Sequence, residues 1–210
     1  MKKLLVEHIS TIHVPKPLLI ESIQKNDGKL IVRNVLLQRA DTPNQNKRVY
    51  PKRILERELD RYSAKIAERR AFSELDHPDS NTVNLKNVCQ AIIDARWSGN
   101  EIYGDVEILN TPSGNIVKEI LLAGYRVGQS SRGLGSVEPL TEGEDDLVEV
   151  QDDFELVTLA DVVSDESTHG ANMMLGESRL LVPDTDLKYD KVNKLITEIR
   201  CELSGICCIK

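Results

Sequence analysis

The stretch RVGQSSRGLGSV, residues 126–137, is the part of the sequence on which the interpretation of the fold depends. It has apolar residues towards both ends and mainly glycine and serine between them, a composition that disfavours a helix. It is therefore either a flexible turn or the end of a strand whose small side chains leave room around a reactive hydroxyl. In the second case, Ser130 and Ser131 are the candidate nucleophiles.

The segments on either side of this stretch have mainly the pattern of strands. Short or alternating apolar runs that are bounded by turn-forming residues are typical of antiparallel hairpins. The tripeptides 26–28 (Asn-Asp-Gly) and 98–100 (Ser-Gly-Asn) each stand between two such runs, so each predicts the turn of a hairpin. The predicted strand regions are residues 4–10, 18–38, 71–75, 88–109 and 154–164.

Three further segments have the period of an amphipathic helix. The first, residues 51–70, carries one apolar stripe at 4-3-4 spacing. The stripe consists of Leu55, Leu59, Tyr62 and Ile66. Thr111 and Pro112 predict the start of the second helix and Gly124 its end, and the third covers residues 189–205. Strands with interspersed helices indicate an α+β domain with a closed or nearly closed antiparallel β-barrel core, to which the last helix is an appendage.

The bulk composition is that of one globular domain. The chain has 210 residues, of which 40% are hydrophobic, enough for a core. No apolar run approaches the roughly 20 residues of a membrane span. Glu7 and His8 interrupt the apolar N-terminus, so we expect neither a signal peptide nor a membrane segment. The cysteines lack zinc-type spacing, so we expect reduced thiols in a cytosolic chain and no metal or cofactor.

The net charge of −7 is distributed unevenly along the chain. Residues 1–70 are rich in lysine and arginine, whereas residues 138–155 contain acidic residues and no base. A basic half can indicate nucleic-acid binding. Here the bases are not interleaved with aromatic residues, and an acidic segment follows. We therefore expect a solvated face or a surface for an acidic protein, and no nucleic-acid partner.

His77 is the histidine best placed to act as a general base. His8 and His13 fall in the predicted N-terminal strand region, and His169 falls in a loop rich in serine and threonine. His77 stands where a strand-like run meets a turn, and Pro78 biases its backbone towards extended geometry. A histidine ring at the end of a strand can point into a cleft and accept a proton. The alternative is an ordinary histidine in a surface turn.

A serine nucleophile also needs an acid that orients the histidine and donors for the oxyanion. Asp161 is a lone acid inside an apolar run, and its burial would be costly unless it were paired. The alternative is an aspartate on the outward face of a strand. The amide groups around Arg132 and Gly133, or the Arg132 guanidinium through water, are the candidate oxyanion donors. The spacing is not that of the G-x-S-x-G elbow, because position 132 is arginine.

Four segments in this order resemble one family. They are NKRVYP at 46–51, ELDHP at 74–78, GQSSRGLGSV at 128–137 and DVVS at 161–164. The set resembles the prohead core proteases of large contractile-tailed phages, which mature procapsids. The fold of that family is related to herpesvirus assemblin, a serine protease built on a β-barrel with surrounding helices. The resemblance covers about residues 1–175 and implies a serine protease.

The resemblance also implies a role for each candidate residue. Ser130 fills the G-x-S position of the family's pattern and becomes the nucleophile, with Ser131 as the alternative. His77 becomes the general base. Asp161 aligns with the position at which assemblins carry a second histidine and phage members often carry an acid. Neither a metal nor a cofactor is implied.

The proteases of this family resemble one another in cutting after a glutamate that has leucine or isoleucine two residues before it. This chain contains that pattern at residues 5–8, 175–178 and 196–199. We therefore predict a zymogen that cleaves itself after Glu177 and Glu198, although the triplet is also common by chance in a chain rich in these residues. Arg96 and Arg132 are the candidate residues for a pocket that binds the substrate glutamate.

The implied organisation is a protease domain over residues 1–175 and a removable tail over residues 176–210. The implied partners are phage scaffold, core and capsid proteins and the chain itself, inside the assembling prohead in the host cytoplasm, with self-association left open. The last predicted helix is either an incorporation signal that docks on scaffold helices or a cover for the core. The rival interpretation of the whole chain is a catalytically inactive assembly module with the same fold.

Overall fold

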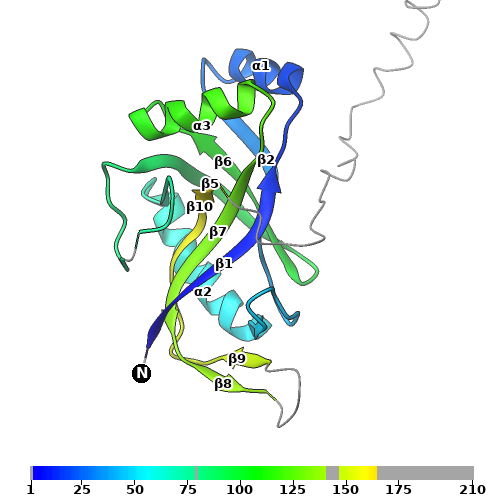
Figure 1. Cartoon of the computed structure of the whole chain (residues 1–210), viewed down its shortest axis with the longest axis vertical. Helices are drawn as coiled ribbons and strands as arrows, with labels where there is room; N and C mark the ends of the chain where they lie inside the picture. The colour runs from blue at the N-terminus through cyan, green and yellow to red at the C-terminus, as the bar shows by residue number, and fades with distance from the viewer. Residues whose placement is uncertain (1, 79, 141–146, 165–210) are drawn as a thin grey trace, which may run out of the picture. The chain divides into compact units, whose positions relative to one another are not determined.

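The computed structural model describes residues 2–78, 80–140 and 147–164 (Figure 1). These residues form three helices, α1 (Lys16–Lys25), α2 (Lys52–Ala67) and α3 (Pro112–Leu122). The strands are β1 (Lys3–Ile12), β2 (Leu30–Arg39), β3 (Arg48–Val49), β4 (Phe72–Glu74), β5 (Val88–Ser98), β6 (Glu101–Ile108), β7 (Val127–Gly135), β8 (Val137–Pro139), β9 (Val148–Val150) and β10 (Glu155–Val163). The predicted tail helix and the predicted cleavage positions Glu177 and Glu198 lie outside the described residues.

The strands form three sheets. The first has the order β1-β7-β10 and the second the order β2-β6-β5-β4, and both are antiparallel throughout. The third is small, with the order β3-β9-β8 and a parallel β3–β9 pair. The stretch at residues 126–137 is therefore not a flexible turn. It supplies β7, the central strand of the first sheet.

The two larger sheets pack against each other but do not close into the predicted barrel. Within the described residues, no continuous ladder joins β1 to β2 or β10 to β4. Side chains bridge these seams instead: Ser10 Oγ donates to Leu36 O over 2.7 Å, and the hydroxyls of Ser73 and Thr158 lie 2.9 Å apart. Irregular pairing interrupts both β1 and β10, and such bulges bend a strand away from a regular ladder. The α+β class is as predicted, but a closed barrel is wrong.

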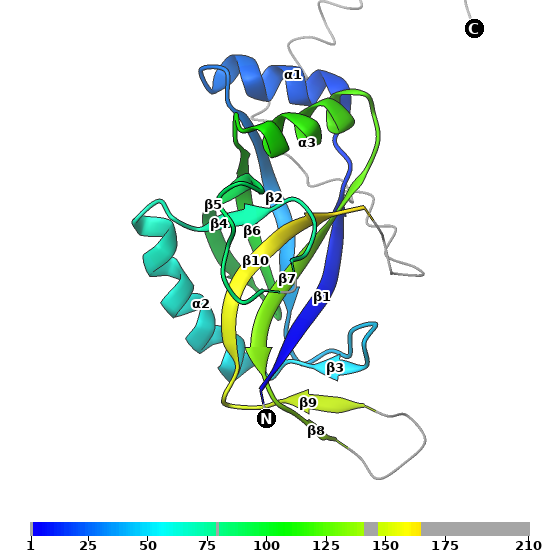
Figure 2. The same cartoon turned by 60° about the vertical axis from the view of Figure 1, so that its left-hand side comes forward.

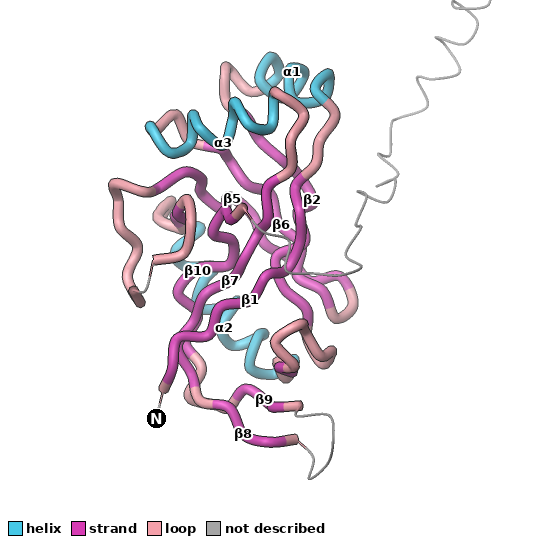
Figure 3. Tube along the Cα trace, viewed as in Figure 1, coloured by secondary structure: helices cyan, strands magenta, loops and turns pink. Residues whose placement is uncertain are grey.

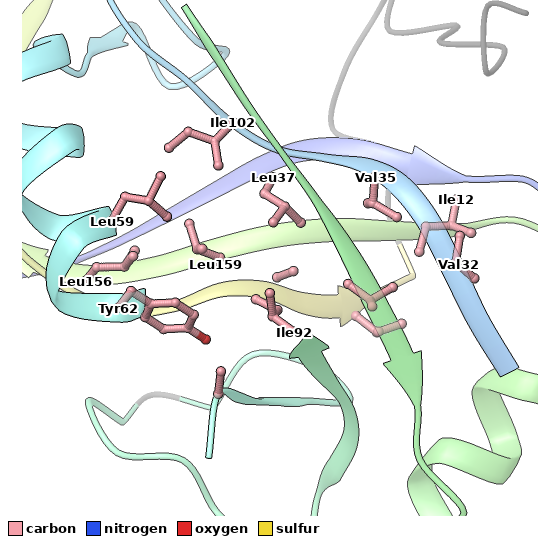
Figure 4. Close-up of a cluster of buried hydrophobic side chains, with 14 of the residues drawn as sticks. Ile12, Val32, Val35, Leu37, Leu59, Tyr62, Ile92, Ile102, Leu156 and Leu159 are labelled. Carbon is pink, nitrogen blue, oxygen red and sulfur yellow. The ribbon is translucent and has the colours of Figure 1, made fainter. Parts of the chain in front are cut away.

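The hydrophobic core lies between the two larger sheets and extends to α2 (Figure 4). Its labelled members are Ile12, Val32, Val35, Leu37, Leu59, Tyr62, Ile92, Ile102, Leu156 and Leu159. The predicted stripe of α2 points into this core, with Leu55, Leu59 and Tyr62 buried and Ile66 packed at its margin. Each fully buried side chain of this size stabilises the fold by about 1.5–3 kcal/mol. This packing supports the first sheet on the side that faces the core.

Residues 16–25 form α1, where the sequence pattern predicted the first strand of a hairpin. The apolar run has a helical contact pair within it, because Leu19 is buried and Ile23, one turn later, packs beside the core. Proline in the first turn is also compatible with a helix. The predicted turn does occur after the helix, with φ of 53° at Asp27 and 85° at Gly28. The second predicted run is β2.

The predicted turn between β5 and β6 and both predicted ends of α3 are confirmed. β5 and β6 form a hairpin whose turn contains Gly99 at φ 63°. Thr111 caps α3, because its Oγ1 accepts a hydrogen bond of 3.0 Å from Gly114 N. Gly124 follows this helix at φ 87°. No helix in the described part of the chain is both long and apolar enough to cross a membrane.

Two connections matter for the site. The segment between β4 and β5 contains no helix or strand in its described residues, and it lies over β10 and β7 (Figures 2 and 3). The segment between β2 and α2 contains β3 and lies against the first half of β1.

Candidate active site

Three side chains lie in one row across the first sheet. In the antiparallel ladders, Ser130 of β7 is paired with His8 of β1 on one side and with Asp161 of β10 on the other. Residues directly opposite each other in antiparallel strands project to the same face. The row therefore brings His8 together with two residues that lie more than a hundred positions later in the sequence.

Ser131 projects to the opposite face of β7 from this row. It accepts a hydrogen bond of 2.9 Å from Gln38 Nε2, and Gln129, two positions earlier, accepts one of 2.7 Å from Gln90 Nε2. Gln38 and Gln90 belong to β2 and β5 of the second sheet. We call this side, towards the second sheet, the inner face, and the side that carries Ser130 the outer face. Successive residues of a strand alternate between the two faces.

His77 lies over the outer face and contacts the row through Asp161. Its Nδ1 is 3.1 Å from Asp161 Oδ2, so with the carboxylate ionised Nδ1 donates and Nε2 is the nitrogen that can accept a proton. Nε2 is buried, and none of the described residues forms a hydrogen bond with it. The side chain as a whole is 15% exposed. A base whose Nε2 has no partner among the described residues therefore contacts Asp161, the residue opposite Ser130 in the ladder.

Asp161 is a fully buried acid with several partners. Its Oδ1 accepts from Glu74 N over 2.9 Å, and its Oδ2 contacts His77 and, at 2.9 Å, Arg132 Nε. The N–H of Arg132 Nε is not aimed at the oxygen, so this contact is an ion pair and not a hydrogen bond. The burial and pairing of Asp161 are what a triad acid requires.

The guanidinium of Arg132 is enclosed, and both of its Nη atoms form hydrogen bonds. Its side chain is inaccessible to solvent, and its Nη atoms donate over 2.6 Å to Glu74 Oε2 and to Ser80 O. Together with Asp161, these contacts link β4, β7, β10 and the segment between β4 and β5. The guanidinium therefore serves internal contacts. The main-chain amides of Arg132 and Gly133 lie in β7, which is paired on both sides at this level.

The hydroxyl of Ser130 is fully buried and donates to Glu7 O over 2.8 Å. In this arrangement its proton faces β1 and not His77. A hydroxyl, an oriented imidazole and a buried acid are nonetheless assembled at one place, which is the equipment of acyl transfer through a serine.

A second imidazole belongs to this site. The ring of His8 packs edge-on against that of His77, with centroids 5.9 Å apart and an interplanar angle of 71°. Sequence reasoning placed His8 in a strand and gave it no role, because only the pairing of β1 with β7 brings it opposite Ser130. Glu74 and Gln90 were missed for the same reason. No spacing in the sequence signals them.

The carboxylate of Glu7 anchors the NKRVYP segment beside the row. Glu7 is buried and accepts hydrogen bonds of 2.7 Å from Arg48 Nη1, Tyr50 Oη and Asn44 Nδ2, and one of 2.6 Å from Asn46 Nδ2. Burial raises the pKa of Tyr50 well above its ordinary value, and the charge of Glu7 adds to this effect. This segment is thus tied to the strand whose carbonyl receives the Ser130 hydroxyl.

Two further positions that the sequence analysis singled out are Glu7 and Arg96. Glu7, the glutamate of the pattern at residues 5–8, lies within β1, so cleavage there would require the strand to unpair. Arg96 lies in the β5–β6 hairpin, where it forms ion pairs with Asp94 and Asp105. Within the described residues, no group of three His, Cys, Asp or Glu side chains is arranged to hold a metal ion.

The nearby thiol of Cys89 is not a competing nucleophile. Burial, together with the negative charge of Asp161, raises its pKa to about 12. The reactive form of a cysteine is the thiolate, which is scarce at neutral pH under these conditions.

Comparisons with known proteins find similarity to proteases. A family model described as prohead core protein serine protease matches residues 8–178, which include His8, His77, Ser130 and Asp161. The chain is 33% identical over 134 residues to the prohead core protein protease of Enterobacteria phage T4, a match that spans 59% of this chain and 63% of that protein's length. It is also similar to the solved structure of the bacteriophage T4 capsid assembly protease, with a TM-score of 0.62 and 28% identity over 78% of this chain and 99% of the other.

Proposed function

The chain belongs to the prohead core protein serine protease family, and from this membership we propose that it is a serine endopeptidase that cleaves scaffold and capsid proteins as phage proheads mature. The observation that carries the proposal is the contact of His77 Nδ1 with Asp161 Oδ2, in a row that contains Ser130. This contact orients the imidazole and leaves Nε2 as its proton acceptor.

Acyl transfer would begin at the hydroxyl of Ser130. Its side chain leaves Glu7 O by rotation to another staggered rotamer, and Oγ attacks the scissile carbonyl carbon while its proton passes to His77 Nε2. Asp161 stabilises the imidazolium that forms. His77 then returns the proton to the leaving amine as the C–N bond breaks. Water, activated by the same nitrogen, hydrolyses the ester and restores the hydroxyl.

The oxyanion of this reaction needs hydrogen-bond donors. Because the Arg132 guanidinium is bound to Glu74, Asp161 and Ser80, the proposal assigns the oxyanion to main-chain amides near Arg132 and Gly133. Since β7 is paired on both sides at this level, catalysis through these amides would require part of that pairing to open.

The proposed substrates are chains with leucine or isoleucine two residues before a glutamate. The same contacts that disfavour Arg132 as an oxyanion donor also disfavour it as the residue that binds the substrate glutamate, because its guanidinium is fully enclosed. Arg96 stays a candidate, since its side chain is 44% exposed. Self-cleavage after Glu177 and Glu198 within the tail of residues 176–210 belongs to the same proposal, and the cut after Glu177 would remove residues 178–210.

The proposed setting is the interior of the assembling prohead in the infected cell, where scaffold, core and capsid proteins are the partners. The rival proposal is an assembly module that has lost activity. The enclosed hydroxyl of Ser130 and its bond to Glu7 O favour that rival to some degree, whereas the open Nε2 of His77 favours the enzyme.

The deciding experiment compares the purified full chain with its Ser130→Ala and Ser131→Ala variants. Each is incubated, followed by intact-mass measurement, and then given a peptide that contains Leu-x-Glu beside a matched Leu-x-Gln peptide. We expect wild type and Ser131→Ala to cut the glutamate peptide and to lose the tail after Glu177. Ser130→Ala should do neither. A wild-type chain that cleaves neither itself nor the peptide would support the inactive module.

A further inference from the structure

The side chain of Gln90 lies on β5 with no solvent exposure and spans the space between the two larger sheets. Its Nε2 donates two hydrogen bonds, one of 2.7 Å to Gln129 Oε1 and one of 2.5 Å to Ala160 O. The first acceptor belongs to β7 and the second to β10. One amide nitrogen of the second sheet thus holds two strands of the first.

The two acceptors are not arbitrary positions on these strands. Gln129 directly precedes Ser130, and Ala160 directly precedes Asp161. The bond to the Gln129 side chain lies on the inner face, opposite the face that carries Ser130, because neighbouring residues of a strand project to opposite faces. The bond to Ala160 O is made to the peptide group that joins Ala160 to Asp161. The two hydrogen bonds of Gln90 therefore act directly behind the row that contains Ser130 and Asp161.

The backbone ladders are irregular at this level, so they do not set the alignment by themselves. The pairing of β10 with β7 shifts register between Thr158 and Asp161, and the pairing of β1 with β7 shifts between His8 and Ser10. A bulge leaves residues unpaired and lets a strand bend. Both shifts fall beside Ser130, which leaves its strand less constrained than a regular ladder would.

From these contacts, and resting on the proposed protease function, we propose that Gln90 is a positioning residue that aligns the Ser130 hydroxyl with the His77–Asp161 pair. It touches neither substrate nor reacting atoms and acts through Gln129 and Ala160. Gln90 Oε1 has no hydrogen-bond partner among the described residues. A buried carbonyl without a partner costs free energy, which partly offsets what the two hydrogen bonds of Nε2 contribute to stability.

The test uses Gln90→Met, which keeps the length of the side chain and removes both bonds. Gln129→Met removes only one of these two bonds, together with the bond of 3.2 Å from Gln129 Nε2 to Gly128 O. Ser22→Ala is the control, because it also removes hydrogen bonds of one side chain outside the row, two with Ile31 and one of 3.4 Å from Asn26 Nδ2. For each full-length variant, kcat and KM are measured on a Leu-x-Glu peptide. Urea unfolding measures stability, and the low-field NMR signal of the His77 Nδ1 proton reports its bond to Asp161.

We expect Gln90→Met to lower kcat by about 10- to 100-fold with KM nearly unchanged, since a displacement of about 1 Å in a site can cost 10²-fold. Gln129→Met should lower kcat by a smaller factor. The His77 signal should broaden or shift in Gln90→Met and stay unchanged in Ser22→Ala, even if both variants lose equal stability.

A folded Gln90→Met variant with wild-type kcat and a wild-type His77 signal would overturn the inference. If that variant does not fold, Gln129→Met decides, and wild-type kcat in it would likewise overturn the inference. A wild-type chain without activity contradicts the proposed function instead. The NMR comparison then still tests the alignment, because it needs no turnover.

Discussion

Ser130 and Ser131 are neighbours in the sequence and lie on opposite faces of the same strand. Ser131 is bonded on the inner face to Gln38, whereas Ser130 lies on the outer face in the row with Asp161. The outer face is the one that His77 covers. The strand geometry thus gives the two hydroxyls different surroundings, which the sequence alone could not do.

This difference predicts that replacing either serine has a different consequence. Ser131→Ala leaves Gln38 Nε2 buried without its acceptor, so we expect a loss of about 1–3 kcal/mol in the free energy of unfolding and retained activity. Ser130→Ala should lose activity by several orders of magnitude. Urea unfolding and peptide cleavage measure the two effects. Full activity in Ser130→Ala together with an inactive, folded Ser131→Ala would exchange the two roles.

Asp161→Asn is predicted to lose both activity and stability. The amide must turn its oxygen to Glu74 N, which places its NH₂ group against Arg132 Nε and His77 Nδ1. The imidazole then presents the wrong nitrogen to Ser130, so we expect a rate about 10³- to 10⁴-fold lower. Single-turnover cleavage kinetics would measure this decrease in rate. An Asp161→Asn enzyme within tenfold of wild type would remove this residue from the triad.

Arg132→Met is expected to destabilise the fold by about 3–5 kcal/mol, because it leaves the carboxylates of Glu74 and Asp161 buried without their cation. The double variant Arg132→Met with Glu74→Met removes one of these charges as well. We therefore expect it to be more stable than Arg132→Met alone, as a urea double-mutant cycle would measure. Purely additive losses would mean that Arg132 and Glu74 are not energetically coupled.

His8 is predicted to support the ring of His77 by its shape. His8→Phe keeps an aromatic edge contact and should preserve kcat, whereas His8→Ala opens space beside the imidazole. An aromatic pair contributes about 0.5–1.5 kcal/mol, which corresponds to a fall in kcat of about 2- to 10-fold. If His8→Phe is as slow as His8→Ala, a polar or charged role of the imidazole replaces this explanation.

Stability is predicted to decline at alkaline pH. Burial raises the pKa of the Cys89 thiol and of the Tyr62 phenol each to about 12, from ordinary values of 9.0 and 10.0. Above about pH 9 the unfolded chain releases protons that the folded chain keeps. The free energy of unfolding therefore falls between pH 9 and 12, by up to about 1.4 kcal/mol per pH unit for each group.

Urea titrations across this range measure the slope, and Cys89→Ala should reduce it. Tyr125→Phe is the control, because the side chain of Tyr125 is 70% exposed and its replacement should leave the slope as it was. An unchanged slope in Cys89→Ala would show that this thiol does not contribute.

Local sequence signals predicted most of the helices and strands and part of the site. The stripe of α2, the Thr111 cap and the turn at Gly99 depend on residues close in the chain, and each occurs as expected. The prediction of a strand at residues 18–25 is wrong, because a short apolar run fits the period of a helix as well as that of a strand when its neighbours in the fold are unknown.

What the sequence could not supply is the pairing between distant strands. His77 and Asp161 were predicted as partners from their residue types and a family resemblance, and the structure brings them together. Glu74, His8 and Gln90 have no local signature, since each takes part only through strands far away in the chain. The open seams between the sheets depend on bulges in β1 and β10, which likewise have no clear sequence signal.

The row across β1, β7 and β10 also has a consequence for the time at which the enzyme can become active. During synthesis, residue 8 leaves the ribosome early, while Asp161 emerges after all the other strands. A nascent chain that ends before β10 has its histidine and its serine but nothing to orient the imidazole. Under the proposed mechanism such a chain cannot cleave the proteins around it, and activity begins only after β10 has been translated and has joined the sheet.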